Sequence, residues 1–203
     1  HGSEANLQSF DWSRFSVLRF GRSVSYPAVN LVTADHVHNA MLAYDEVRKR
    51  GYRRVGFACE ALHKHWYLFD AGFLQAQQRV PKKEQLSVFH AESDLLTQTN
   101  LESFASWLKK EKPDAIITSL GYIPEMLEQL GYSLPGDIGI AAMSILDGHA
   151  DAGIFQNSDE VGRVAALSLI AQIQDNDFGV PRLHRETLVR GDWVDGNSLP
   201  NRA

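Results

Sequence analysis

Segments typical of strands and segments typical of helices alternate along most of the chain, and this alternation constrains the fold more than any other feature. Short apolar runs of strand type lie at 55–59, 86–89, 114–119, 138–143 and 186–190. Between them, apolar residues recur at the helical spacings of three and four at 35–50, 66–78, 99–112, 124–130 and 158–174. The run at 138–143 lacks polar alternation, as expected for a parallel strand covered on both faces. The sequence therefore predicts an α/β fold with parallel, doubly wound sheets.

Local signals place several helix ends. Asp35 stands where an N-cap is expected, and Gly51 follows that helix as a left-handed terminator. The pair Thr99 and Glu102 has the spacing of a capping box and predicts the start of another helix, which Pro113 ends. The helix from Ser158 to about residue 174 carries apolar residues so widely around it that we expect it to be largely buried.

The segment at 48–54 reads RKRGYRR, with five basic residues in seven, and raises the question of nucleic-acid binding. The whole chain has a formal net charge of −5, so no overall positive field attracts it to phosphate backbones. Basic residues in the last turn of a helix also complement the negative end of the helix dipole. Position and net charge together favour a solvated turn between a helix and a strand.

Composition and missing motifs exclude several classes. One cysteine, Cys59, rules out an internal disulfide framework; inside an apolar strand it is expected to be a small buried hydrophobe, with a reactive thiol as the minor alternative. No apolar run approaches the ~20 residues of a membrane span, so we expect a cytoplasmic protein. Dinucleotide, triphosphate and hydrolase motifs are absent, and isolated histidine pairs do not supply a metal-ligand set. We therefore expect no enzymatic activity, cofactor or metal.

An ordered series of motifs resembles a known family. The segment VTADHVHNAMLAYDEVRKRGYRRVGFAC at 32–59 is similar to an aspartate, helix, basic turn and strand in the effector-binding core of bacterial LacI/GalR transcription regulators. Further matches are the glycine-phenylalanine pair at 72–73, KPDAIITS at 112–119 and LPGDI at 134–138. Gln156 with Gly162, and LVR at 188–190, match the closing helix and strand.

The resemblance implies two Rossmann-like lobes that close on a small molecule, as in periplasmic binding proteins. Residues 1–50 and 156–183 would form the amino-side lobe, and residues 51–155 and 184–203 the carboxyl-side lobe. The family reads operator DNA through a separate helix-turn-helix in a homodimer. Too few residues precede the matched region to contain that head and the first strands of the lobe. The resemblance thus implies a fragment with an incomplete amino-side lobe.

By the same resemblance, Asp35 and Gln156 match positions that line the ligand cleft, and both side chains can hydrogen-bond hydroxyl groups. Phe69 and Ser144 occupy cleft positions where sugar-binding members carry arginine and aspartate, which puts the usual sugar ligand in question. Aromatic side chains after the strand at 55–59 offer faces for a sugar ring, or alternatively pack at a helix start; they are His63, Trp66 and Tyr67.

We therefore expect a sugar-sensing core of a transcription regulator, with a small-molecule effector as its partner. A solute-binding protein of a transporter with the same fold is the alternative, and an α/β enzyme would need a nucleophile and base that the sequence does not supply. The expected dimer surface combines Tyr122, Met126 and Leu127 on a short helix with the segment at 148–155. Packing of these residues inside their own lobe is the competing interpretation.

Overall fold

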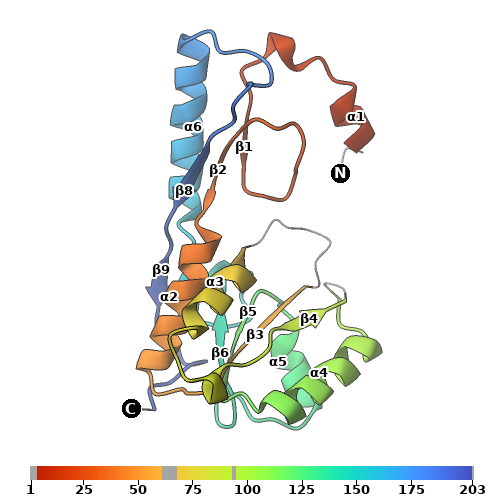
Figure 1. Ribbon diagram of the computed structural model, residues 1–203, viewed down its shortest axis with the longest axis vertical. Coiled ribbons are helices and arrows are strands. Elements are labelled where there is room, and N and C mark those ends of the chain that lie inside the picture. Colours follow the sequence, from red (N-terminus) through yellow and green to blue (C-terminus); the bar gives the residue numbers. More distant parts are fainter. Residues whose placement is uncertain (1–3, 61–67, 93–94, 203) are drawn as a thin grey trace. The chain divides into compact units, whose positions relative to one another are not determined.

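The computed structural model describes residues 4–60, 68–92 and 95–202 (Figure 1). The chain divides into two compact units, each assembled from separated stretches of sequence. The first contains His1–Asp35 and Asn157–Arg190, and the second contains His36–Gln156 and Gly191–Ala203. The boundaries thus differ from those expected at residues 50 and 183. The helix that begins at His36 belongs with the second unit because its buried side chains join that unit's core.

The second unit is built on a six-stranded sheet with the order β4-β3-β5-β6-β7-β9. Its strands are β3 (Val55–Glu60), β4 (Phe89–Ala91), β5 (Ala115–Thr118), β6 (Gly139–Ala142), β7 (Gly153–Phe155) and β9 (Asp192–Val194). All neighbouring pairs are parallel except β7 and β9. The predicted α/β fold with mainly parallel sheets is confirmed.

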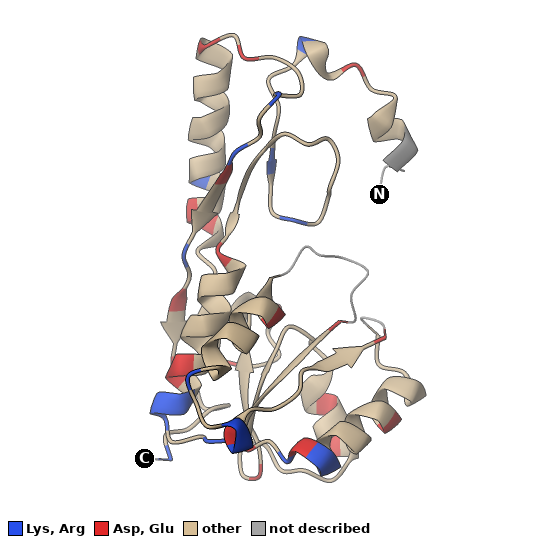
Figure 2. Ribbon diagram, viewed as in Figure 1, with Lys and Arg blue, Asp and Glu red and all other residues tan. Residues whose placement is uncertain are grey.

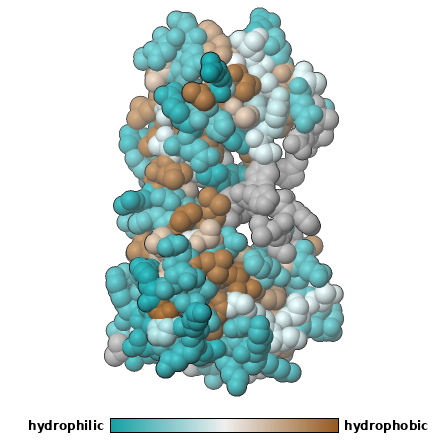
Figure 3. All heavy atoms as spheres, viewed as in Figure 1, coloured by the Kyte–Doolittle hydropathy of each residue, from teal (hydrophilic) through white to brown (hydrophobic). Residues whose placement is uncertain are grey.

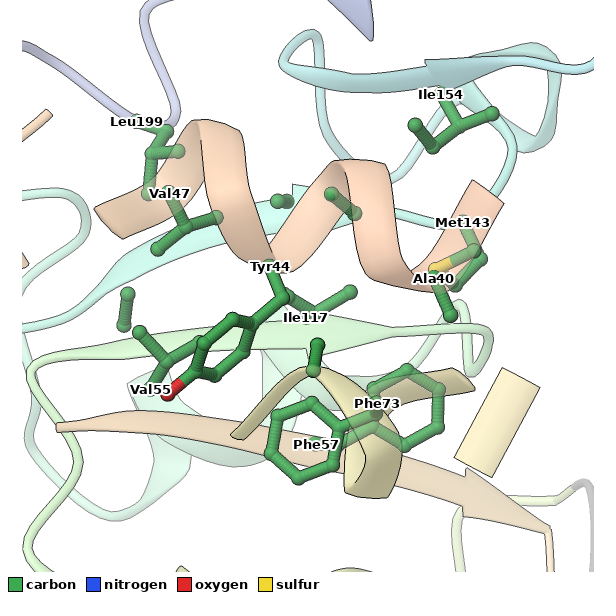
Figure 4. Packing of buried hydrophobic residues seen from close by; sticks show 14 of the residues in the cluster. Ala40, Tyr44, Val47, Val55, Phe57, Phe73, Ile117, Met143, Ile154 and Leu199 are labelled. Atoms are coloured by element: carbon green, nitrogen blue, oxygen red, sulfur yellow. The ribbon is translucent and has the colours of Figure 1, made fainter. Parts of the chain in front are cut away.

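Helices cover both faces of this sheet. They are α2 (His36–Lys49), α3 (Phe69–Gln77), α4 (Gln98–Glu111) and α5 (Ile123–Gln129). Helices α2 and α3 pack in one core cluster with Phe57 and Ile117, where the rings of Phe57 and Phe73 stack 5.1 Å apart (Figure 4). Helices α4 and α5 pack in a second cluster with residues adjacent to these on the same strands, Ala58 and Ile116. The strand period of two therefore divides the apolar residues between two helical layers.

Two glycines allow the layers to approach closely. A Cβ at Gly72, in the glycine-phenylalanine motif, would lie 2.3 Å from the carbonyl oxygen of Val37, so no larger residue fits between α2 and α3. A Cβ at Gly56 on β3 would lie 2.5 Å from the indole of Trp107 on α4. Close approach of the Val37 backbone and of the Trp107 ring is the reason that these positions carry no side chain.

The helix ends follow the predicted chemistry, with one shift. The N-cap of α4 is Thr97, whose side chain accepts a hydrogen bond from the backbone nitrogen of Asn100, so the predicted cap at Thr99 was wrong by half a turn. Lys112 ends the same helix in a left-handed conformation (φ 48°) just before Pro113. A threonine two residues earlier offers the same capping chemistry, which local sequence alone does not distinguish.

The basic segment at 48–54 is internal scaffolding of the second unit. Arg48 pairs with Glu84 at 2.7 Å, and the guanidinium of Arg54 donates to the backbone carbonyl of Lys83 at 2.8 Å. Figure 2 shows basic and acidic residues together where α2 ends near the 3-10 helix Lys82–Glu84. The backbone nitrogens of Arg53 and Arg54 donate to the Asp114 carboxylate. These charges bind the end of α2 to neighbouring loops.

Residues 193–202 pack against the same basic segment at 48–54. Arg50 pairs with Asp195 and lies over the ring of Trp193, 4.7 Å from its centroid. The hydroxyl of Tyr52 donates to the Pro200 carbonyl, and the guanidinium of Arg202 lies over the Tyr52 ring. The segment after β9 is therefore part of the second unit's core rather than a loose end.

The first unit has a parallel three-stranded sheet with the order β1-β2-β8. Its elements are α1 (Glu4–Gln8), the 3-10 helix Trp12–Arg14, β1 (Leu18–Phe20), β2 (Asn30–Ala34), α6 (Ser158–Gln174) and β8 (Glu186–Val189). A small cluster centred on Val32, Val161 and Ala165 holds α6 against the strands.

The expectation that α6 is largely buried was wrong. Only its inner stripe is covered, and Leu167, Ile170 and Ile173 are 50–55% exposed. Figure 3 shows hydrophobic residues, in brown, at the surface of the part that contains this helix. Apolar residues on both sides of a helix do not show that both sides are buried, because a sheet that packs against the helix buries only the side chains that face it.

The expected dimer surface is also corrected. Met126 and Leu127 are completely buried in the second unit's core, and Tyr122 packs against that cluster. In the segment at 148–155, Ala152 and Ile154 are buried as well. The four buried residues are covered by their own unit and are unavailable to a partner, whereas Tyr122 is partly exposed. Among the described residues, no helix combines the length and hydropathy needed to cross a bilayer.

Candidate functional site

The carboxyl ends of the parallel strands form the edge where open α/β sheets bind ligands. In the second unit, this edge is formed by the residues that follow β5, β6 and β7. It presents the turn at Ser119–Gly121, then Ser144, then Gln156. All three come from strands that are paired or linked within one sheet, so the fold gathers them along one edge.

Gln156 and Ser144 lie next to each other on this edge. The side-chain nitrogen of Gln156 donates to the carbonyl of Met143 at 2.8 Å, which fixes the carboxamide beside the residue that precedes Ser144. Ser144 has extended backbone and begins the 3-10 helix Ile145–Asp147 without a side-chain capping bond. Both residues are partly exposed. A carboxamide oxygen and a hydroxyl are thus presented together, a pair suited to hydroxyl groups of a ligand.

A buried hydroxyl shapes the neighbouring turn. Thr118 Oγ1 donates to the carbonyl of Ala58 at 3.0 Å and accepts from the backbone nitrogen of Leu120 at 2.9 Å. These bonds reverse the chain directly after β5 and bring Gly121 near His149, whose Nδ1 would lie 3.9 Å from a Cβ at that glycine. The turn therefore places an imidazole at the same sheet edge.

His149 is a polar group that the sequence analysis did not single out. Both ring nitrogens are buried, and neither has a hydrogen-bond partner of normal geometry among the described residues. Burial lowers the pKa of His149, and the Asp147 carboxylate and the Thr118 backbone offset only part of this effect. A single histidine in a segment rich in glycine and aspartate gives no periodic signal, so only the fold reveals its position.

Asp35 directly follows β2 and is the last residue of the first unit's opening stretch. Its backbone nitrogen donates to the carbonyl of Val189 at 2.7 Å, which anchors it at the carboxyl end of β8. The residue is partly buried. Each unit therefore carries one of the two residues that the resemblance assigned to a ligand cleft, Asp35 in the first and Gln156 in the second.

The remaining expected ligand residues fall into two groups. Phe69 is 4% exposed, belongs to a core cluster and packs against His36 with ring centroids 4.5 Å apart. This contact makes it a core side chain in the structure, where its ring closes the start of α3 over α2. His63, Trp66 and Tyr67 lie outside the described residues.

The described residues contain no group of three or more histidine, cysteine, aspartate or glutamate side chains placed to hold a metal ion. Cys59 packs against the core of the second unit, and burial raises the pKa of its thiol to about 12. The thiol is therefore protonated at neutral pH and is a poor nucleophile.

Solved structures with this architecture are numerous, although no family model and no curated protein matches the sequence. A LacI transcriptional regulator from a Rhodococcus species aligns over 95% of this chain and 75% of its own, with TM-score 0.73 and 19% identity. A transcription regulator like protein from Staphylococcus haemolyticus aligns over 90% of this chain and 66% of its own, with TM-score 0.66 and 21% identity.

A LacI family regulator from Enterococcus faecium with bound ribose aligns over 92% of this chain and 71% of its own, with TM-score 0.65 and 15% identity. The chain thus spans about two thirds to three quarters of the length of these proteins. Sequence identities this low support a shared fold, but they do not identify the ligand of this chain. The chain has the fold of the effector-binding core found in LacI-type transcriptional regulators.

Proposed function

We propose that this chain is the sugar-sensing core of a LacI-type transcription regulator. The observation that carries the proposal is the match of nearly the whole chain to solved regulators of that type, including units assembled from separated stretches of sequence. One solved protein of this fold holds ribose. A hydroxyl-rich effector is the chemistry that Asp35, Ser144 and Gln156 would recognise.

Each unit carries polar residues at the carboxyl ends of its strands. Asp35 supplies a carboxylate from the first unit, and Gln156 with Ser144 supplies a carboxamide and a hydroxyl from the second. A ligand that binds these groups favours the conformation of the chain that holds it, since binding shifts the balance between conformations. We propose this shift as the signal that the regulator transmits.

The proposed function is binding without chemistry. The protonated Cys59 lies in a core strand, and His149 has no nucleophile within hydrogen-bonding geometry among the described residues. Operator DNA would be read by a head outside residues 1–203, because the net charge is −5 and the basic segment at 48–54 is paired internally. The homodimer stays a prediction, with an interface other than Met126 and Leu127.

A thermal-shift titration with ribose, other pentoses and cellobiose tests the proposal. A sugar that binds only the folded chain raises Tm as its concentration increases. At a free sugar concentration of a hundred times Kd, binding increases the free energy of unfolding by about 2.7 kcal/mol. We expect Asp35→Ala and Gln156→Ala each to remove most of that shift. Calorimetric titration of the same variants then reports the loss of affinity directly.

Matched control variants keep the test specific. Asp45→Asn removes a carboxylate on α2 that pairs with Arg79 at 2.7 Å, and Gln129→Ala removes an exposed amide on α5. Both lie away from the strand ends and should leave the sugar response unchanged. An unchanged response in Asp35→Ala and Gln156→Ala would contradict the assigned site, and no response to any sugar would contradict the effector class.

A further inference from the structure

A cavity lies within the first unit, between α6 and the sheet. Its volume is about 300 Å³, at the lower end of the range for small-molecule pockets, roughly 300–1,000 Å³. Strand residues that line it include Leu18 and Asn30, the first residues of β1 and β2, and Arg185, which directly precedes β8. The cavity is therefore at the amino-terminal edge of the sheet.

This position separates the cavity from the carboxyl-edge site. Asn30 and Asp35 are five residues apart on an extended strand, so the two locations differ by roughly 16 Å at about 3.3 Å per residue. Figure 1 shows α6 running alongside the strands of this unit, with its last turns toward the amino-terminal edge. A ligand in the cavity would not occupy the site proposed above.

The inner face of α6 changes character along the helix. Val161 and Ala165 close the first half of the helix against the strands, and Ser168 and Gln172 continue the same stripe at helical spacing in the second half. The larger apolar residues of the second half, such as Ile170 and Ile173, are exposed instead. Polar side chains thus face the sheet where apolar packing is normally found.

Gln172 points to a ligand. It is 9% exposed, yet its Oε1 is buried with no hydrogen-bond partner among the described residues. Buried acceptors without a partner are rare in folded proteins, because the group loses its bond to water without replacement. Ser168 donates its only hydroxyl proton to the Val164 carbonyl at 2.8 Å, so it also faces the cavity as an acceptor.

The remaining lining defines the ligand's chemistry. Asp175 and Asp177 add carboxylates and Arg185 adds a guanidinium, while Leu18 and Val32 supply apolar surface. Two carboxylates disfavour a phosphate or another anion, and the unpaired carboxamide disfavours a hydrocarbon. We propose that this cavity binds a small neutral polyol, of monosaccharide size or smaller, whose hydroxyl groups bond to the polar side chains of its wall, among them Gln172 and Ser168.

Nuclear magnetic resonance of the whole ¹⁵N-labelled chain tests the proposal with glycerol and ribose as probes and inorganic phosphate for comparison. We expect glycerol or ribose to shift the amide signals of Ala171 and Thr187, which line the cavity, and phosphate to leave them unchanged. The shifts should persist in Asp35→Ala, where the proposed carboxyl-edge site is lost. The two proposals therefore fail independently.

Two variants test the assigned contact. Gln172→Leu removes the acceptor and should weaken probe binding at this cavity roughly tenfold or more, and Ser168→Leu should block the cavity by filling it. Leu167→Gln changes the exposed face of the same helix and should bind normally. Melting curves establish that each variant is folded. Absence of shifts at both reporters in the unaltered chain, larger shifts with phosphate, or equal shifts in folded Gln172→Leu would overturn the proposal.

Discussion

The two units contain the same kinds of elements but cover their sheets to different extents. In the second unit, helices on both faces bury two separate clusters of apolar residues. In the first unit, α6 packs against the strands through a small cluster that centres on three buried residues. Eleven of the fifteen large hydrophobic side chains that are exposed among the described residues lie in this smaller unit.

The difference shows that strand and helix alternation determines connectivity but does not guarantee cover. A second helical layer buries strand residues on both faces of the second unit's sheet. The first unit has exposed apolar residues on α6 and also at Phe20 and Leu188 on its strands. Apolar surface concentrated in this way is typical of an interaction surface rather than of an isolated small domain.

The largest expected effect compares a buried and an exposed position. Met126→Asp introduces an unpaired charge into a completely buried site, and we expect the second unit to lose about 4 kcal/mol or more of unfolding free energy. Leu167→Asp changes an exposed residue of α6 and should alter stability by less than about 0.5 kcal/mol. Urea denaturation measures both. Equal losses would show that α6 is covered in solution and would remove the contrast between the units.

An intermediate effect compares one ion pair from each unit. Arg48 pairs with Glu84 through side chains that are 16% and 21% exposed, and it also donates to the Arg53 carbonyl. Arg48→Ala should therefore cost about 2 kcal/mol. The exposed pair Arg163 and Glu160 on α6 should contribute nothing measurable, so Arg163→Ala serves as the control. A loss in Arg48→Ala no larger than that in Arg163→Ala would contradict the scaffold role of the basic segment.

The smallest expected effect is a pH dependence confined to the second unit. The pKa of His149 is lowered by burial below its ordinary value of 6.5, so the unfolded chain binds this proton more readily than the folded chain. The stabilisation is complete above pH 6.5 and is lost as pH falls through the folded-state pKa. His149→Leu should flatten the decline in unfolding free energy below neutral pH. An unchanged slope in the variant would show that another group causes it.

Much of the fold could be predicted because local signals and tertiary packing agree. Helix α4 ends at the lysines before Pro113, and the apolar run that contains Ile116 and Ile117 is a central strand, as the sequence indicates. The short strands β7 and β9 were missed, since three residues carry no usable alternation. Short elements depend on partners that are distant in sequence, and these are visible only in the fold.

The candidate site was only partly predictable. Asp35 and Gln156 were proposed from motif resemblance, whereas His149 and Gln172 have no motif and are distinguished by buried polar atoms that have no hydrogen-bond partner among the described residues. The apolar pattern of Met126 and Leu127 did not reveal which side of a short helix would be covered. Sequence periodicity identifies the apolar face of a helix. Whether the chain's own sheet or a partner covers that face depends on the whole fold.

The antiparallel strand β9 and the residues after it have a consequence for the order of synthesis. Leu199 is buried in the second unit's core, and the backbone nitrogen of Arg202 donates to the carbonyl of Arg50. When the ribosome has translated residues 36–156, the second unit therefore still lacks its edge strand β9 and the core residue Leu199. The second unit cannot complete its core and its sheet before residues 191–202 emerge, and the first unit's closing helix and strand emerge before them. Chaperone contact with the open β7 edge during that interval would be a direct outcome of the split arrangement.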